Sequence, residues 1–320
     1  MPSIRFQNNS YSLNENESVL DCLLRHDVAV SYSCKSGACQ ACLMQSTSPG
    51  LPPSSQNGLK TTMMAQGFFL ACQCVPSSDL DVGEADIEID AVIKTKAPLN
   101  RASIQVEIEP CQPFDYRAGQ YIQLKRGDGL VRSYSIASLP GGPLQIHVER
   151  IDGGAMSNWI HDELQPGDRV KIRGPVGDCF YVPGAPEQPL LLAGTGTGLA
   201  PLVGIARDAL ENGHQADIHL YHGSLTRERL YLVDELFALA QQHPQFHYTP
   251  CVKEDNAEKG IQTGDIEEIV LSADPAFKEW RAYLCGNPAL VNSLRKKLFL
   301  KGASNKNIFS DAFLLSHAAK

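Results

Sequence analysis

Four cysteines constrain the first part of this 320-residue chain more than any other feature. Cys34, Cys39 and Cys42 follow a C-x4-C-x2-C pattern, and Cys72 comes after 29 further residues. This is the spacing of a plant-type [2Fe-2S] site, in which four thiolates hold the cluster. The glycine and small side chains between these cysteines would let backbone amides turn toward sulfur. We therefore predict that Cys34, Cys39, Cys42 and Cys72 ligate a [2Fe-2S] cluster.

A structural zinc site is the alternative for the same cysteines. Such sites usually pair two C-x2-C knuckles, whereas the second half here offers only Cys72-Gln73-Cys74, whose spacing is poor for zinc. Cys72, rather than Cys74, is the expected fourth ligand because of its distance from Cys42. Apart from one cysteine discussed below, the others are expected to be core or surface residues: Cys22, Cys111, Cys179 and Cys251.

Charge and composition limit the possible partners. A hydrophobic content of 43% excludes a disordered chain, and a net charge of −8 argues against nucleic acid, whose binding depends on Lys and Arg. Residues 1–88 hold 4 Lys+Arg against 9 Asp+Glu, which predicts an acidic docking surface for a protein of complementary charge. The alternative is that the acidic residues only keep this segment soluble, and it explains the same charge counts equally well.

No segment is predicted to span a membrane. Pro189 to Ala206 lacks charged residues, but two prolines and four glycines make it a poor membrane helix. We expect a buried strand, a glycine turn and the start of a helix there. Because the first residues also lack the basic-then-apolar order of a signal peptide, we expect reduced cysteines and a cytoplasmic location.

Hydrophobic periodicity divides the chain into three predicted domains, over residues 1–88, 89–185 and 186–320. The first has short strands and helices around the cysteine loop. The second alternates with period two between Gly/Pro turns, which predicts an antiparallel barrel. The third alternates strands with helices, which predicts a parallel sheet with helices on both faces. The expected helices lie at 19–25, 59–66, 202–210, 230–241, 265–271 and 289–298, with one in the barrel that begins near Ser157 and runs through Leu164 to Pro166-Gly167.

Two motifs in the middle domain suit a bound flavin dinucleotide. In Arg132-Ser133-Tyr134-Ser135 the guanidinium can pair with a phosphate, the tyrosine can stack on an isoalloxazine ring, and the last hydroxyl can reach the polar edge of that ring. Gly153-Gly154-Ala155-Met156-Ser157 stands at a helix start, whose amides suit a pyrophosphate. Each motif alone is common, so their order and separation carry the prediction. The predicted FAD contacts are Arg132, Tyr134, Ser135, Gly154, Ala155, Met156 and Ser157.

A third motif suits a dinucleotide phosphate. The strand at 190–193 runs into Gly194-Thr195-Gly196-Thr197-Gly198, which combines a strand, a glycine turn and a helix start. The spacing differs from G-x-G-x-x-G, so we assign no standard Rossmann fingerprint. Cys285-Gly286-Asn287-Pro288 follows a later strand. A buried strand-end cysteine is the alternative explanation of that segment.

In this order the motifs resemble those of the three-domain reductase components of bacterial oxygenases, and the resemblance covers nearly the whole chain. It implies a multi-domain α+β and α/β protein: a β-grasp-like ferredoxin, an antiparallel FAD-binding β-barrel and a doubly wound parallel-sheet NAD-binding domain. The glycine turn resembles the G-T-G-x-A-P loop of the ferredoxin-NADP reductase superfamily. That likeness implies that Gly196, Thr197 and Gly198 bind the nicotinamide cofactor.

The resemblance also assigns the end of the chain. Cys285-Gly286-Asn287-Pro288 resembles the family's C-G-x-P motif, which places Cys285 and Gly286 beside the nicotinamide ring. The segment 309–313 resembles a terminal strand beside the flavin, so Phe313 or Asp311 would contact the ring edge. The residues implied to act in hydride transfer are Cys285, Ser135 and Phe313.

The implied activity is that of an oxidoreductase. Electrons would pass from NADH to FAD, then to the [2Fe-2S] cluster and to a partner oxygenase, either a ring-hydroxylating dioxygenase or a multicomponent monooxygenase. A reductive enzyme of the deoxysugar type is the alternative acceptor. The alternative from another class is a redox-responsive binding protein without sustained turnover.

The choice between NADH and NADPH depends on charge. NADP-selective relatives carry Ser-Arg and Tyr where this chain has Val252, Lys253 and Gln262, so we expect NADH. Arg227 and Arg229 near the second strand leave NADPH possible.

Overall fold

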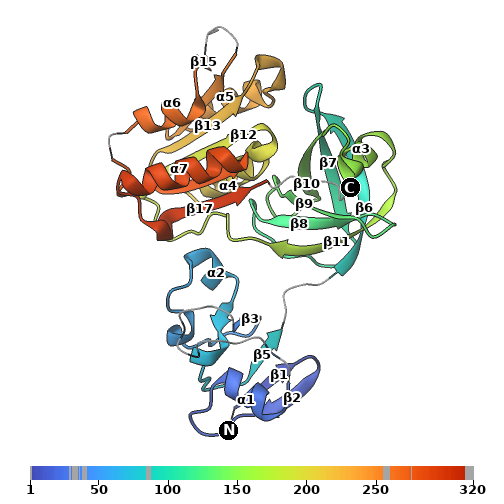
Figure 1. Cartoon of the computed structure of the whole chain (residues 1–320), viewed down its shortest axis with the longest axis vertical. Coiled ribbons are helices and arrows are strands. Elements are labelled where there is room, and N and C mark those ends of the chain that lie inside the picture. The colour runs from blue at the N-terminus through green and yellow to red at the C-terminus, as the bar shows by residue number, and fades with distance from the viewer. Residues whose placement is uncertain are drawn as a thin grey trace. The chain divides into compact units, whose positions relative to one another are not determined.

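The computed structural model describes residues 2–28, 30, 35, 37, 42–83, 88–254, 260–274 and 276–313. The chain divides into two compact units, Met1–Asp86 and Ile87–Lys320. Figure 1 shows both, and each is described by itself. No helix within the described ranges is long and apolar enough to cross a membrane.

The first unit is a five-stranded sheet in the order β2-β1-β5-β3-β4, the β-grasp-like arrangement that we expected. β1 pairs with β2 as an antiparallel hairpin and with β5 in parallel. α1 begins after Ser18, whose hydroxyl accepts a hydrogen bond from the Asp21 amide, and the helix buries its apolar face in the core. The elements are β1 (Ser3–Phe6), β2 (Asn9–Ser12), α1 (Val19–Arg25), β3 (Leu43–Ser46), η1 (Pro53–Gln56), α2 (Thr61–Ala65), β4 (Phe68–Leu70), η2 (Ala71–Gln73) and β5 (Leu80–Gly83).

The second unit begins with a six-stranded antiparallel sheet in the order β10-β7-β6-β11-β8-β9. The sheet closes because Ile136, just after β9, forms a bridge to Ile146 of β10. Alternate side chains of its strands fill one apolar core, as the period-two pattern predicted. The elements are β6 (Glu88–Pro98), β7 (Ser103–Pro110), β8 (Tyr121–Lys125), β9 (Val131–Ser135), β10 (Leu144–Glu149), α3 (Ala155–Asp162) and β11 (Arg169–Val176).

The rest of this unit is a parallel sheet in the order β15-β14-β13-β12-β16-β17. α4 and α5 pack on one face of the sheet and α6 and α7 on the other (Figure 1), which confirms the doubly wound prediction. The elements are β12 (Leu190–Thr195), η3 (Gly196–Gly198), α4 (Leu199–Glu211), β13 (Ile218–Ser224), η4 (Arg227–Arg229), α5 (Val233–Gln242), β14 (Phe246–Val252), β15 (Gln262–Thr263), α6 (Ile266–Ser272), β16 (Arg281–Gly286), α7 (Pro288–Leu300), η5 (Asn305–Asn307) and β17 (Ile308–Ala312).

Three helices are shorter than predicted. α5 begins at Val233 instead of residue 230, because Leu232 has a left-handed φ of 56° that a continuous helix does not accept. α3 ends at Asp162, since the amides of Glu163 and Leu164 both donate to the Trp159 carbonyl and turn the chain away. α2 covers only Thr61–Ala65 of the helix expected over 59–66.

His147 and His222 are two of the three histidines that are buried in the described part of the second unit, His214 being the third. His147 Nδ1 is 3.1 Å from the Tyr231 hydroxyl, and His222 Nδ1 is 3.1 Å from the Tyr248 hydroxyl. Neither Nε2 atom has a hydrogen-bond partner among the described residues. Burial lowers the pKa of both imidazoles to about 3, so they are neutral in the folded protein.

We expect this pair to make the second unit sensitive to acid. The unfolded imidazoles take up protons near pH 6.5, whereas the folded ones stay neutral down to about pH 3. Because the unfolded state binds more protons between these values, the free energy of unfolding falls as the pH drops below about 6.5, by about 1.4 kcal/mol per pH unit for each histidine. Denaturant unfolding measured between pH 7.5 and pH 5 follows this slope.

The variant His222→Gln removes one of the two groups and should reduce the slope. His243→Gln, at the end of α5 and outside this pair, serves as the control. An acid slope equal in wild type and His222→Gln would contradict the assignment.

Candidate functional site

Cys42 and Cys72 lie together where β3 pairs with β4. Leu43 is paired with Leu70, and the Ala71 amide donates to the Cys42 carbonyl over 3.0 Å, which joins η2 to the start of β3. Burial raises the pKa of the Cys42 thiol, which also interacts with the backbone and side chain of Cys72. The structure thus brings two of the four predicted ligands into contact. Cys34 and Cys39 lie outside the described residues.

The surroundings of Cys72 fit a sulfur-rich group. Gln73 Nε2 lies 3.5 Å from Cys72 Sγ and 3.1 Å from the Lys35 carbonyl oxygen, so this side chain ties the cysteine loop to η2. Gly37 has a φ of +82°, and a Cβ there would lie 3.1 Å from Gln73 Cγ. The loop therefore needs glycine at this close approach. Cys74, the alternative ligand, is fully buried and its side chain bonds to Ser55.

The predicted flavin contacts on β9 divide between two faces of the strand. Arg132 and Tyr134 are two residues apart and share one face, where both are half-buried. Ser135 is buried, and its hydroxyl donates to Asp311 Oδ2 over 2.7 Å. Burial raises the pKa of Asp311, and the bond from Ser135 partly offsets that effect. An aromatic face and a hydroxyl–carboxyl pair are thus presented from one strand.

The start of α3 lies near the Arg132 end of β9. Arg126, in the hairpin between β8 and β9, donates to the Ala155 carbonyl over 2.9 Å and so connects that hairpin to the helix start. Gly154 precedes the helix without a side-chain cap, and a Cβ there would lie 2.5 Å from Ser157 Oγ. Ser157 Oγ is already used, since it accepts from the Ile151 amide and donates to the Gly154 carbonyl.

These observations fit an anion at the start of α3, with Arg132 of β9 as the cation predicted to pair with it. The guanidinium supplies charge, and the first-turn amides, which include Met156, have no side-chain acceptor at the cap. The uncapped helix start therefore fits the pyrophosphate of a flavin dinucleotide, and the predicted stacking of Tyr134, whose side chain packs partly against the barrel core, stays a prediction. The side chain of Ser157 stabilises the turn through these two hydrogen bonds, and its predicted contact with the flavin stays a prediction.

The predicted nicotinamide loop packs directly on the backbone of β16. A Cβ at Gly198 would lie 2.5 Å from the Cys285 carbonyl oxygen, and one at Gly194 would lie 2.7 Å from it. Gly286 has a φ of +105°, and a Cβ there would lie 2.6 Å from the Thr195 carbonyl oxygen. Larger residues at any of the three would separate the two strand ends.

Asp311 and Phe313 complete this strand-end cluster. β17 pairs in parallel with β16, with Asp311 opposite Cys285, and the Phe313 amide donates to the Gly286 carbonyl over 2.8 Å. Thr197 stands in the glycine loop on η3 and is partly exposed. The carboxyl ends of β12, β16 and β17 therefore meet the barrel strand β9 at the Ser135–Asp311 hydrogen bond.

Two residues of this region were not identified from the sequence. Cys179, expected to be an ordinary core or surface cysteine, is buried with its Sγ 3.8 Å from Cys285 Sγ. Glu149, at the end of β10, would lie 3.2 Å from a Cβ at Gly196 and forms an ion pair with Arg229. Both come from the barrel part of the chain, so no local motif could indicate them. Cys285 itself is fully buried.

Replacing Gly198 tests the contact between the loop and β16. The Cβ of Gly198→Ala would overlap backbone atoms of Cys285, so we expect a loss of about 1–3 kcal/mol of stability and a fall of about 100-fold in kcat/KM for the nicotinamide nucleotide. Thermal unfolding and steady-state oxidation of the nucleotide measure the two effects. Gly142→Ala, whose Cβ would have no atom within 4 Å, is the matched control. Unchanged stability and kcat/KM in Gly198→Ala would disprove the role.

Comparisons with known families agree with this architecture. Residues 5–77 match the 2Fe-2S iron-sulfur cluster binding domain, residues 90–181 the oxidoreductase FAD-binding domain, and residues 192–296 the oxidoreductase NAD-binding domain. The boundary predicted near residue 185 falls between the last two matches and stays a prediction.

Individual proteins resemble the chain over nearly its whole length. The ferredoxin–NAD(P)(+) reductase component of the naphthalene 1,2-dioxygenase/salicylate 5-hydroxylase systems of a Ralstonia species is 32% identical, covering 92% of this chain and 93% of the relative. The CDP-6-deoxy-L-threo-D-glycero-4-hexulose-3-dehydrase reductase of Yersinia pestis is 29% identical, covering 96% of each chain. A solved ferredoxin reductase of carbazole 1,9a-dioxygenase shares the fold with a TM-score of 0.65 at 24% identity, covering 98% of both chains.

The iron–sulfur, FAD-binding and NAD-binding matches thus follow one another along this chain in the order of the predicted motifs. The domains imply an oxidoreductase whose cofactors are a [2Fe-2S] cluster, FAD and a nicotinamide nucleotide. The chain belongs to the family of ferredoxin–NAD(P)(+) reductase components, and it carries all three matched domains in one polypeptide.

Proposed function

We propose that this reductase oxidises NADH and delivers single electrons to the oxygenase component of a multicomponent system. The observation that carries the proposal is the Ser135–Asp311 hydrogen bond, which joins the flavin strand β9 to the nicotinamide sheet at β17. Bound FAD would accept a hydride and release electrons singly to the cluster. The flavin and nicotinamide sites must therefore face each other. This hydrogen bond holds β9 of the flavin site next to β17 of the nicotinamide site.

The residues of this chain contribute positioning and one proton-holding pair. The glycines of the loop permit close approach of the nucleotide to β16, and Phe313 is held beside Gly286 by its amide. Because burial raises the pKa of Asp311, its carboxyl group holds a proton more readily than an exposed one, and Ser135 can relay that proton. Cys285 and Ser135 act here by contact and hydrogen bonding, and neither is required as a nucleophile.

The partner is proposed from the relatives. The Ralstonia relative is the reductase component of dioxygenase and hydroxylase systems, which supports an oxygenase acceptor. The Yersinia relative is the reductase of a deoxyhexulose dehydrase, which makes a reductive enzyme the second candidate acceptor. We favour the oxygenase because the dioxygenase-type relative has the higher identity to this chain.

We propose that the acceptor docks on the first unit. The cluster expected in the first unit must come close to the acceptor for electron transfer. Exposed carboxylates lie on the same unit, among them Glu15, Asp27, Asp79 and Asp81. Such a surface would steer a basic partner. A reducing compartment, the cytoplasm, suits the free cysteines among the described residues and the expected cluster.

The order of electron flow is tested with Cys72→Ser. In the anaerobic wild-type protein, NADH should bleach both the flavin and the iron–sulfur absorption. In Cys72→Ser the flavin should still bleach and ferricyanide reduction should persist, while NADH-dependent reduction of cytochrome c should fall at least about 100-fold, because one-electron delivery then lacks its iron–sulfur donor. Absorption spectra and steady-state rates measure these effects.

Cys74→Ala is the matched control, since Cys74 lies two residues away and is buried against Ser55. It should retain the cluster and cytochrome c reduction. Full cytochrome c reduction in Cys72→Ser would refute the proposed route. If docking uses the acidic surface, the wild-type rate with a basic acceptor should also fall as ionic strength rises.

NADH preference is supported by the setting of Lys253. This cation follows β14, and its Nζ lies 3.2 Å from Asp265 Oδ2, so a carboxylate already neutralises the charge that a 2′-phosphate would need. Val252 is buried, and Gln262 lies on β15 with an amide in place of a tyrosine. Arg229 forms an ion pair with Glu149, so its charge is less available to bind the 2′-phosphate of NADPH.

Removing the carboxylate should therefore improve NADPH use. In the wild type, the backbone amide of Glu267 donates to the Asp265 side chain, which caps α6. The side-chain oxygen of Asn in Asp265→Asn can still accept this hydrogen bond. Lys253 loses its carboxylate partner in the variant and becomes available to a phosphate. We expect kcat/KM for NADPH to rise about 1.5- to 5-fold, as for one exposed ion pair, with little change for NADH. Glu267→Gln removes another carboxylate of the same helix turn and is the control. Equal effects in both variants would rule out a specific role of Asp265.

A further inference from the structure

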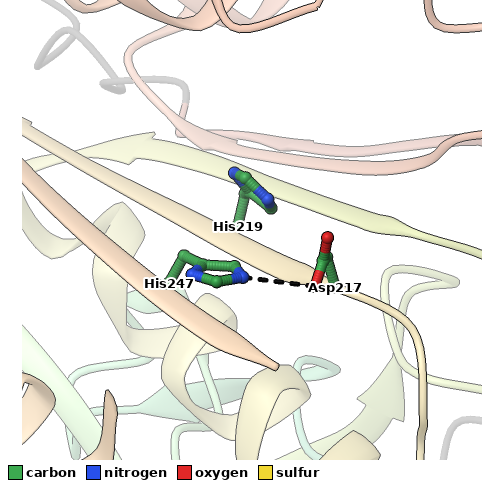
Figure 2. Close-up of side chains that lie close together, drawn as sticks. All are labelled: Asp217, His219 and His247. Atoms are coloured by element: carbon green, nitrogen blue, oxygen red, sulfur yellow. Dashed lines mark hydrogen bonds and ion pairs between the residues drawn. The ribbon is translucent and has the colours of Figure 1, made fainter. Parts of the chain in front are cut away.

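Three potential metal ligands gather at the amino-terminal edge of the parallel sheet. His219 and His247 are the second residues of β13 and β14, and they lie opposite each other in the parallel register. Asp217 directly precedes β13 (Figure 2). One possible ligand atom from each of the three lies within 4.8 Å of the others. The edge therefore presents two imidazoles and one carboxylate to the same point.

The backbone fixes this arrangement. Neighbouring strands lie about 4.8 Å apart, so register-paired side chains on one face are forced into proximity. The two imidazole centroids are 4.6 Å apart, and His247 Nε2 is 3.2 Å from Asp217 Oδ1. A tetrahedral ion with ligands at about 2.0–2.2 Å needs ligand atoms roughly 3.4 Å apart. Small side-chain rotations therefore suffice to place all three around one ion.

The surroundings favour a cation and leave one position open. His219 is half-buried, and Trp280 packs against it edge-on with ring centroids 5.3 Å apart. The carboxylate of Asp274, which accepts from Trp280 Nε1, adds negative charge near His219. On the other side, the side chains of His247 and Asp217 are 45% and 62% exposed, so a water molecule can reach the site.

We propose that Asp217, His219 and His247 bind a divalent transition-metal ion, with Zn²⁺ as the expected occupant and water as the fourth ligand. Two imidazoles and one carboxylate suit zinc or its neighbours better than the hard cations Mg²⁺ and Ca²⁺, which prefer oxygen ligands. The alternative is that the same groups form only the observed imidazole–carboxylate contact. This proposal rests on residues that serve none of the cofactor sites described above.

The position of the site indicates a structural role. β13 runs from this edge toward Gly223, which lies opposite Thr195 at the nucleotide end. At about 3.3 Å per residue, that end is roughly 13 Å away from His219. An ion here would clamp the starts of β13 and β14 together without touching the nucleotide. We therefore expect it to stabilise the sheet and to leave NADH oxidation unchanged.

Calorimetric titration of the full-length protein, loaded with flavin and cluster, with ZnCl₂ tests the proposal. Wild type should bind one more Zn²⁺ equivalent than His247→Gln or Asp217→Asn, or bind it at least about 10-fold more tightly, a difference of about 1.4 kcal/mol. His243→Gln, a nearby histidine outside the cluster, should behave like wild type. Zinc taken up by cysteines is common to all four proteins and cancels in the comparison.

A second readout uses the tryptophan beside the site. The chain has 2 tryptophans, so Trp159→Phe leaves Trp280 as the single indole. Ni²⁺ should quench the emission of Trp280 in this background, and adding His247→Gln should abolish the quenching. NADH–ferricyanide activity confirms that each variant is folded. Equal zinc stoichiometry and affinity in wild type and both site variants, or quenching that persists in His247→Gln, would overturn the proposal.

Discussion

The backbone contact between the glycine loop and Cys285 is the constraint on which the nucleotide end of this protein depends. Gly194 and Gly198 have no Cβ, so the end of β12 can lie against the Cys285 carbonyl at distances that any side chain would prevent. With β12 and β16 held together, β17 can pair on the far side of β16. Asp311 then reaches Ser135 of the barrel. The missing side chains of these glycines are therefore as important for bringing the strand ends together as the hydrogen bonds between them.

The first unit uses a different principle. Its cysteine loop carries few apolar side chains, so core packing cannot hold it. Among the described residues, Gln73 ties the loop to η2 through the Lys35 carbonyl, and Cys42 and Cys72 are brought together by the pairing of β3 with β4. The sheet therefore brings together part of a thiolate site, and a bound cluster would add cross-links between this sheet and the cysteine loop.

Polar groups buried in the second unit show how its sheets constrain each other. His147 and Tyr231 join β10 to the segment before α5, and His222 and Tyr248 join neighbouring strands of the parallel sheet. These imidazoles are neutral because burial penalises their charged form. The cysteine pair, Cys179 with Cys285, joins the end of the barrel segment to β16 in the same region.

Sequence alone determined the element order and the chemistry of the motifs. α1 was predicted with its exact bounds, because a polar cap precedes a short apolar face, and the doubly wound sheet followed from alternating strands and helices. The start of α5 was missed, because Leu230 and Tyr231 are buried outside the helix and Leu232 has a left-handed φ of 56°. Local patterns carry no information about such packing.

Only the tertiary structure decided which distant residues meet. Ser135 with Asp311, Cys179 with Cys285, and Asp217 with His247 are pairs from different segments, and sheet order and register bring them together. Spacing along a chain specifies which residues share a turn or a strand face. It does not specify the neighbouring strand or the register, because these depend on the packing free energy of the whole fold.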